Sequence, residues 1–114
     1  MKEIKAYIRP DAIEPVIREL EIAGARDLTI IRVDAFGAIS DANESDHHLF
    51  HKYAAKYSAV TKLEIVCPDA DVSRFTKIVQ KLAYTGAHGD GRIFVSDIDA
   101  ALNIRTGAEG EAAL

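Results

Sequence analysis

Residues 62–96 read KLEIVCPDADVSRFTKIVQKLAYTGAHGDGRIFVS, and this stretch predicts a strand, a helix and a second strand in succession. The apolar run 62–67 is typical of a strand. From 71 to 84 the apolar residues recur at helical spacing, and Gly86 is the expected stop of that helix. The short run 92–96 predicts the closing strand. This segment is therefore a β-α-β unit.

The first part of the chain predicts the same order of elements. Residues 2–9 alternate between apolar and polar side chains, as in a half-buried strand. Apolar residues recur at helical spacing over 11–23, and the β-branched run 28–36 predicts another strand. The complete order is β-α-β-β-α-β, the ferredoxin-like split sandwich. It is an α+β fold with two helices on one face of a four-stranded antiparallel sheet.

Local signals indicate where the helices begin and end. Asp11 followed by Glu14 resembles a capping box at the first helix. Pro15 is tolerated there because it falls in the first turn, and Gly24 suits a left-handed helix end. A further helical turn is expected near residues 99–102, before a glycine-punctuated tail.

Length and composition indicate one soluble domain. A chain of 114 residues can bury a core without disulfides or metal ions. A net charge of −4 with 14 Lys and Arg argues against a nucleic-acid partner, which requires a basic face. Cys67 lies in an apolar run and is expected to be buried in its strand. Neither a signal peptide nor a bilayer-length apolar run is recognised, so we expect the cytoplasm.

Two helices cover one face of such a sheet and leave the other face open. We expect isoleucine, valine and leucine on that open face, which would be costly in water. The chain is therefore expected to assemble with copies of itself, although the sheet does not specify how many.

The connection between the second and third predicted strands spans residues 38–60, far longer than a hairpin requires. Loops of this length are usually functional or disordered. Its second half, LFHKYAAKY (49–57), can form a short helix. If the preceding segment is helical too, His47 and His51 share a face, as two metal ligands would, and His48 lies beside them. Solvated imidazoles are the alternative.

Residues 85–92, TGAHGDGR, contain three glycines within six positions. Such a loop lets backbone N–H groups turn inward around a phosphate, with Arg92 as a bidentate partner. The alternative is an ordinary turn, because the Walker spacing is absent. Arg105, in the Gly-rich tail, is a second candidate clamp or a solvated cation. We expect no enzyme, since no nucleophile has an evident base and turn chemistry accounts for Asp90.

Four stretches together carry a family resemblance: MKEIKAYIRP, DAFG, TGAHGDGRIFV and IRTGAEGEAAL. In this order they resemble the P-II signal-transduction proteins. The resemblance covers residues 1–37 and 62–114. It implies a homotrimer that binds an adenine nucleotide in the clefts between subunits.

The resemblance also assigns roles to segments and residues. It implies a single domain, 1–114, with a T-loop at about 38–60, a B-loop at about 84–92 and a C-terminal loop at about 102–114. The T-loop would dock on a membrane transporter or a regulated enzyme, and its contact residues would include His47, His48, His51 and Tyr53. The implied nucleotide-binding residues are Thr29, Phe36, Gly37, Glu64, Val66, Gly89, Asp90, Gly91, Arg92 and Arg105.

The chain departs from the family pattern at four positions. Ala35 stands where the family has a glycine, and Ile39 where it has a glutamine for magnesium and 2-oxoglutarate. Val60 and Asn103 replace a lysine and an arginine. Each charge-assisted hydrogen bond contributes roughly 1.5–3 kcal/mol. The two missing cations therefore predict that ADP or AMP is favoured over ATP and that 2-oxoglutarate is not sensed.

The divergent long loop predicts a divergent partner. Tyr53 lacks the surroundings of the family's modified tyrosine, so nucleotidylylation is not expected. The resemblance extends to P-II-like variants of inorganic-carbon uptake, for which AMP, ADP and bicarbonate are the signals. A nitrogen-regulatory P-II that controls ammonium transport with ATP and 2-oxoglutarate is the alternative. A metal-responsive trimer like the CutA proteins is an alternative of another class.

Overall fold

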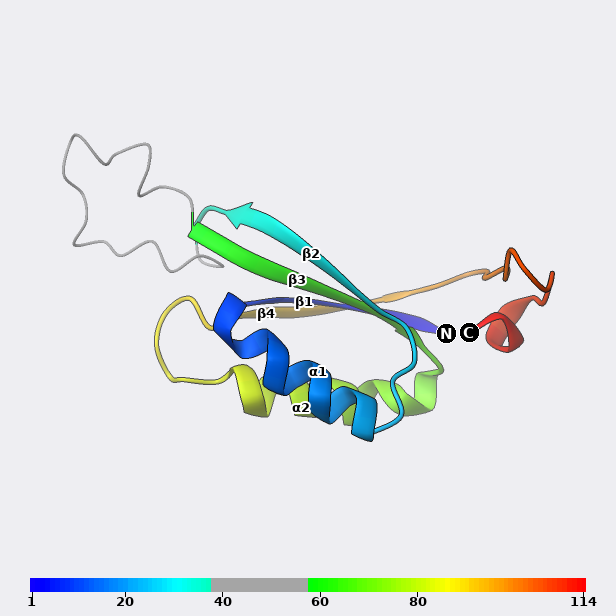
Figure 1. The fold of residues 1–114 in the computed structure, drawn as a ribbon, viewed down its shortest axis with the longest axis horizontal. Helices are drawn as coiled ribbons and strands as arrows, with labels where there is room; N and C mark the ends of the chain where they lie inside the picture. Colours follow the sequence, from blue (N-terminus) through cyan, green and yellow to red (C-terminus); the bar gives the residue numbers. More distant parts are fainter. Residues whose placement is uncertain (38–57) are drawn as a thin grey trace.

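A computed structural model describes residues 1–37 and 58–114 of the chain (Figure 1). Its strands and helices are β1 Lys2–Ile8, α1 Ile13–Ile22, β2 Leu28–Ala35, β3 Ser58–Cys67, α2 Val72–Ala83 and β4 Gly91–Asp97. This order confirms the predicted β-α-β-β-α-β arrangement. No helix in the described ranges is long and apolar enough to cross a membrane.

The four strands form one antiparallel sheet in the order β2-β3-β1-β4. Both helices lie on the same face of this sheet (Figure 1). The register places Ala6 of β1 opposite Leu63 of β3 and opposite Ile93 of β4. β1 is therefore a central strand, and its last residues lie directly beside the start of β4.

The core lies between the sheet and the helices. Alternate residues of the strands point to the helix face because side chains alternate along a strand. Val16 and Leu20 of α1 and Phe75 and Val79 of α2 cover them, all at most 1% exposed. Cys67 is buried as predicted, and this burial raises the pKa of its thiol.

The first helix begins differently from the prediction. A 3-10 turn, Pro10–Ala12, precedes α1, and the residue that caps α1 is Ala12, which makes no side-chain capping bond. The predicted capping box was wrong because Asp11 lies inside this turn. The predicted end is confirmed: Gly24 has φ +98°, and the N–H of Ala25 donates to the carbonyl of Leu20.

Two further boundaries differ from the sequence-based expectation. α2 ends at Ala83 because Tyr84 is extended, at φ −69° and ψ 127°. Gly86 is therefore not the helix stop but part of the loop that follows. β3 begins at Ser58, so 58–60 belong to the strand and not to the long connection.

The tail forms no helical turn at 99–102. Leu102 instead makes an isolated antiparallel bridge with Glu109, and the chain ends in the 3-10 turn Gly110–Ala113. The residues between the two bridge positions form a separate turn. Local sequence gave no sign of this pairing because it joins two short segments across a glycine-containing reversal.

The open face of the sheet mixes apolar side chains with ion pairs. Lys5 Nζ lies 3.0 Å from Glu3 Oε1, and Lys62 Nζ lies 2.7 Å from Glu64 Oε1. The prediction of isoleucine and valine is confirmed, since Ile31 and Val66 lie on this face. The prediction of leucine was wrong, because Leu63 points into the core. This face is therefore less apolar than the sequence suggested.

Tyr7 occupies the middle of the open face. Its ring packs edge-on against Phe94, with 6.0 Å between the ring centroids. The ammonium group of Lys62 lies 5.8 Å from the same ring on the other side. Phe94 remains 47% exposed in the single chain, so apolar surface is available here for a second protomer.

Candidate functional site

The loop that joins α2 to β4, residues 84–90, lies at the end of the sheet where β2 ends and β3 begins (Figure 1). Its glycines adopt positive φ angles, +87° at Gly86 and +92° at Gly89. Gly91, at φ +110°, starts β4. A Cβ atom there would lie 1.7 Å from the carbonyl oxygen of Tyr7. Only glycine allows β1 and the loop to approach so closely.

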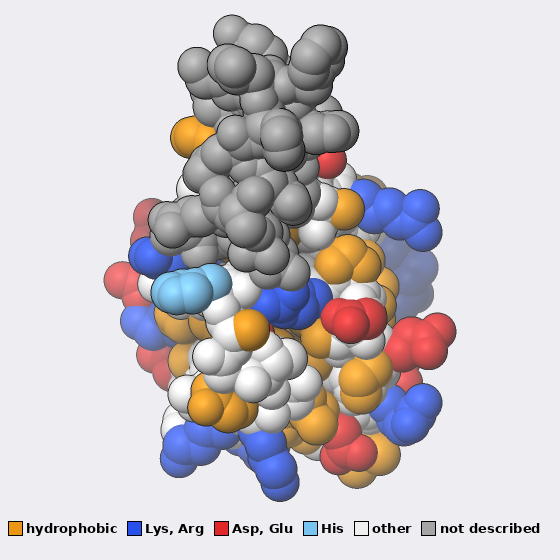
Figure 2. Space-filling model, turned by 90° about the vertical axis from the view of Figure 1, so that its left-hand side faces the viewer, with side chains coloured by type: hydrophobic (Ala, Val, Ile, Leu, Met, Phe, Trp, Pro, Cys, Tyr) orange, Lys and Arg blue, Asp and Glu red, His pale blue; other side chains and the backbone are white. Residues whose placement is uncertain are grey.

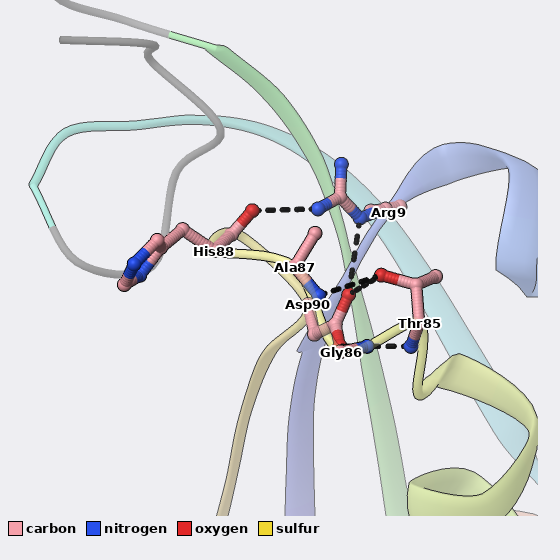
Figure 3. Close-up of polar contacts among 6 residues, drawn as sticks. All are labelled: Arg9, Thr85, Gly86, Ala87, His88 and Asp90. Carbon is pink, nitrogen blue, oxygen red and sulfur yellow. Dashed lines mark hydrogen bonds and ion pairs between the residues drawn. The ribbon is translucent and has the colours of Figure 1, made fainter.

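Asp90 holds the loop closed. Its carboxylate accepts hydrogen bonds from the N–H groups of Thr85, at 2.8 Å, and Gly86, at 2.9 Å, and from the Thr85 hydroxyl (Figure 3). The Thr85 hydroxyl and these N–H groups lower the pKa of Asp90 to about 2. The carboxylate is thus ionised at neutral pH and turned toward the loop's own donors. This position is the turn role that the sequence offered as an alternative for Asp90.

Arg9 joins this loop to β1. Its Nη2 donates to the carbonyl oxygen of His88 at 2.6 Å, and its Nε lies 3.4 Å from Asp90 Oδ1 (Figure 3). In the sequence, Arg9 is recognisable only as a polar position of the first predicted strand. Its role depends on the strand order, because β1 and β4 are neighbours only in the folded sheet. An arginine at a strand end, followed by proline, was the one available signal.

Arg92 follows the loop on the open face of β4. It lies opposite Tyr7, which in turn lies opposite Lys62. Its side chain is exposed and makes no ion pair with any residue that the structure describes. Figure 2, which views this end of the molecule, shows basic and hydrophobic side chains side by side. The Arg92 side chain is therefore accessible beside the loop.

Phe36 and Gly37 lie just past the end of β2, at the same end of the sheet as loop 84–90 (Figure 1). Phe36 is 61% exposed, and Gly37 has φ +89°. The structure thus brings this predicted pair to the end that carries the glycine loop and Arg92.

Thr29, Glu64 and Val66 form a second group, on the open face of β2 and β3. Thr29 and Glu64 are direct cross-strand neighbours. Ideal strand spacings place Glu64 roughly 12 Å from Arg92 on the same face. The carboxylate of Glu64 is paired with Lys62. Within one chain this group lies apart from the loop, since the register places Val66 level with Ser96, near the far end of β4.

Arg105 belongs to the tail, which leaves β4 at the end of the sheet opposite the loop (Figure 1). The side-chain oxygen of Asn103 accepts from the N–H groups of Arg105, at 3.0 Å, and Thr106, at 3.1 Å. The seven residues of β4 separate this turn from the loop, which is about 20 Å of strand. Arg105 and Arg92 of one chain therefore cannot hold the same small anion.

Some predicted residues lie outside the described ranges, namely Ile39, His47, His48, His51 and Tyr53. Among the described residues, no three His, Cys, Asp or Glu side chains are grouped as metal ligands.

A cavity of about 380 Å³ opens beside the loop, between α2 and β4. Its floor includes Val79, Ala83 and Ile93, and Lys77 and Arg92 line it as well.

The sequence profile of a known family, described as "Nitrogen regulatory protein P-II", matches residues 1–108. This chain belongs to the P-II family. It is 40% identical to "Nitrogen regulatory protein P-II 2" of Methanothermobacter thermautotrophicus, over 100% of this chain and 97% of that protein. It is also 34% identical to a P-II protein of Porphyra purpurea and 32% identical to GlnK of Escherichia coli, with both chains covered completely in each case.

The family match confirms several of the predictions. P-II proteins are regulatory signal transducers and not enzymes, and their fold is the one found here. The homotrimer is typical of the family, whose members bind adenine nucleotides and regulate transporters or enzymes. The match is to P-II and not to the CutA-like class considered as an alternative.

Proposed function

We propose that this protein is an adenine-nucleotide sensor that binds ADP or AMP in preference to ATP. It controls a transporter or an enzyme through the segment between β2 and β3. One observation carries the proposal: a glycine loop closed by Asp90 stands beside the exposed Arg92, while Val60 and Asn103, at two cation positions of the family, are uncharged.

The loop suits a phosphate group. Its positive-φ glycines keep side chains out of the way, and backbone N–H groups are the donors that cradle phosphates. Arg92 adds a bidentate cation from the start of β4. Arg105 of a neighbouring protomer supplies the second cation, because within one chain the tail lies at the end of the sheet opposite the loop. Thr29, Glu64 and Val66 bound the base and ribose in this arrangement.

The two uncharged positions argue against strong binding of a third phosphate. Val60 is only 5% exposed in β3, opposite Val33. The side chain of Asn103 is engaged by the backbone of its own turn. Neither position offers a cation. Each missing charge-assisted hydrogen bond weakens ATP binding by roughly 1.5–3 kcal/mol, whereas AMP and ADP have fewer charges to neutralise.

Two metabolic roles remain in competition. We place the protein in inorganic-carbon metabolism, with bicarbonate as the second signal, because the predicted loss of 2-oxoglutarate binding removes the nitrogen signal. The second candidate is control of ammonium transport with ATP and 2-oxoglutarate. The names of the relatives favour that candidate, since each describes a nitrogen regulatory protein.

A thermal-shift panel of AMP, ADP, ATP and cyclic AMP, each with and without bicarbonate or 2-oxoglutarate, tests the proposal. A ligand that binds only the folded state stabilises it by RT ln(1 + [L]/Kd), so the shifts rank the ligands directly. We expect larger shifts for ADP and AMP than for ATP. Tight ATP binding that 2-oxoglutarate strengthens would refute the preference and favour the nitrogen role.

The Arg92→Ala variant tests the site itself. It should abolish the phosphate-dependent part of every shift, because Arg92 directly follows the loop and its side chain is exposed. Arg18→Ala, which removes the same charge from the exposed side of α1, is the control. Unchanged shifts in Arg92→Ala would place the nucleotide elsewhere.

A further inference from the structure

The loop before β4 contains a tight turn whose central residues are His88 and Gly89. Gly89 has φ +92°, and no residue other than glycine has a positive φ in the described ranges, so the φ of His88 is negative. A negative φ followed by a positive φ is the signature of a type II β-turn. Turn 87–90 therefore has the form that requires glycine at its third position.

The orientation of one peptide group distinguishes this turn from its common alternative. Types I and II differ mainly by a half-turn of the central peptide, here the one between His88 and Gly89. The peptide is trans, so its carbonyl and its N–H point in opposite directions. Arg9 holds the carbonyl of His88 at 2.6 Å, on the β1 side of the loop (Figure 3). The N–H of Gly89 must then point away from β1.

We infer that Arg9 is a positioning residue of the phosphate site: it selects the type II form of turn 87–90 and thereby presents the N–H of Gly89 to the ligand. This inference rests on the proposed function, in which the glycine loop holds the phosphates. Among the described residues, none accepts a hydrogen bond from that N–H. A donor in this orientation suits an incoming phosphate oxygen.

The work of Arg9 is separate from that of Asp90. Without Arg9, Asp90 still accepts from the two N–H groups and the hydroxyl of residues 85 and 86. The base of the loop therefore stays closed when Arg9 is replaced. The orientation of peptide 88–89 loses its restraint, because glycine at 89 tolerates both forms.

An arginine suits this position better than a lysine. Its planar guanidinium donates from fixed directions, so Nη2 reaches the His88 carbonyl while Nε faces Asp90. A lysine ammonium is a single point of charge and lacks this fork. Arg9→Lys keeps the charge near the ligand but weakens the restraint on the peptide, which separates electrostatics from geometry.

The test measures the turn and the ligand separately in the full-length protein. In NMR spectra, a type II turn gives a strong contact between the Hα of His88 and the amide proton of Gly89, and a type I turn gives a weak one. We expect Arg9→Gln to weaken this contact. We expect Gly89→Ala to weaken it as well, because alanine disfavours the positive φ of a type II turn. Arg18→Gln, on α1, is the charge-matched control.

The binding arm uses ADP and adenosine with the same variants. Arg9→Gln should weaken ADP about tenfold, the equivalent of one hydrogen bond to a charged group, and leave adenosine unchanged. Arg9→Lys should weaken ADP binding less than Arg9→Gln does if the charge contributes to affinity. It should weaken ADP binding equally if only the geometry of the turn matters. In both cases it should weaken the NMR contact.

A strong contact that persists in Arg9→Gln overturns the inference. A weakened contact with unchanged ADP affinity also overturns it, since the turn would then not matter to the ligand. Wild-type protein that binds no adenylate refutes the proposed function instead. The NMR arm still decides in that case whether Arg9 selects the turn.

Discussion

Two turns of this molecule are each held by a side-chain oxygen that accepts from two backbone N–H groups, but they lie at opposite ends of the sheet. In the loop before β4, the Asp90 carboxylate accepts from two backbone N–H groups. In the tail, the Asn103 amide oxygen accepts from the N–H groups of Arg105 and Thr106. The loop is also tied to a neighbouring strand through Arg9, whereas the bonds of the tail turn lie within the tail.

This difference indicates two different tasks. The loop is closed by the ionised carboxylate of Asp90 and anchored to β1 by Arg9. It can therefore bind a ligand without the entropy cost of first becoming ordered. The tail turn is locally ordered, yet Ile104 is 99% exposed and Arg105 is exposed too. This exposed tail turn resembles a segment whose contacts are completed only by a second protomer. The open face of the sheet and the family's trimer are consistent with that need.

The largest expected effect distinguishes the glycines of the two turns. Gly91→Ala places a Cβ atom against the backbone of Tyr7 and adds the strain of φ +110°. We expect a loss of more than about 3 kcal/mol in the free energy of unfolding, measured by denaturant titration. Gly107→Ala is the matched control, since no atom lies within 4 Å of its Cβ position at φ +73°. Its cost should be about 1–2 kcal/mol, from backbone strain alone. Equal losses would show that the close approach of β1 does not matter.

The next prediction tests whether the loop of one protomer and the tail turn of its neighbour form one site. Arg92→Ala and Arg105→Ala should each weaken ADP at least about tenfold. Trimers mixed from the two variants should regain high-affinity sites, because an intact Arg92 on one protomer then faces an intact Arg105 on its neighbour. Calorimetry of co-refolded mixtures measures the fraction. No recovery in mixed trimers would exclude a site shared in this way.

A smaller effect is expected from a change in the tail turn alone. Asn103→Ala removes the acceptor for two backbone N–H groups and should cost about 1 kcal/mol of stability. ADP affinity should fall with it, because Arg105 loses its fixed position. Asn103→Asp keeps an acceptor at the same place and should restore most of both. Thermal unfolding and ADP titration of the same samples check this, and an ADP affinity unaffected by Asn103→Ala would contradict it.

The smallest effect concerns acid. The pKa of Asp90 is about 2 in the folded protein, below the value of about 3.9 for a free aspartate. Its contribution to stability is therefore fully present above about pH 4 and is lost as the pH falls toward about 2. In Asp90→Asn this part of the acid dependence should disappear. Asp27→Asn, at an exposed position, should leave it unchanged. Identical acid unfolding of wild type and Asp90→Asn would contradict the assignment.

Sequence alone predicted the elements because their signals are local. Apolar periodicity gave the strands and helices, and Gly24 marked the end of α1 through its conformational freedom. The glycines of the TGAHGDGR stretch and the RTG ending marked the loop, the tail and the family. The errors were local too. The capping box failed because a 3-10 turn begins at Pro10, and the expected tail helix failed because Leu102 pairs with Glu109.

What only the tertiary structure decided depends on which strands are neighbours. Because β1 lies beside β4, Arg9 meets His88 and Asp90, which are about eighty positions away in the chain. Because β4 separates the loop from the tail, Arg92 and Arg105 belong to opposite ends of the sheet within one protomer. Sequence patterns carry the conformation of each segment, but the pairing of distant segments comes from burying one shared core.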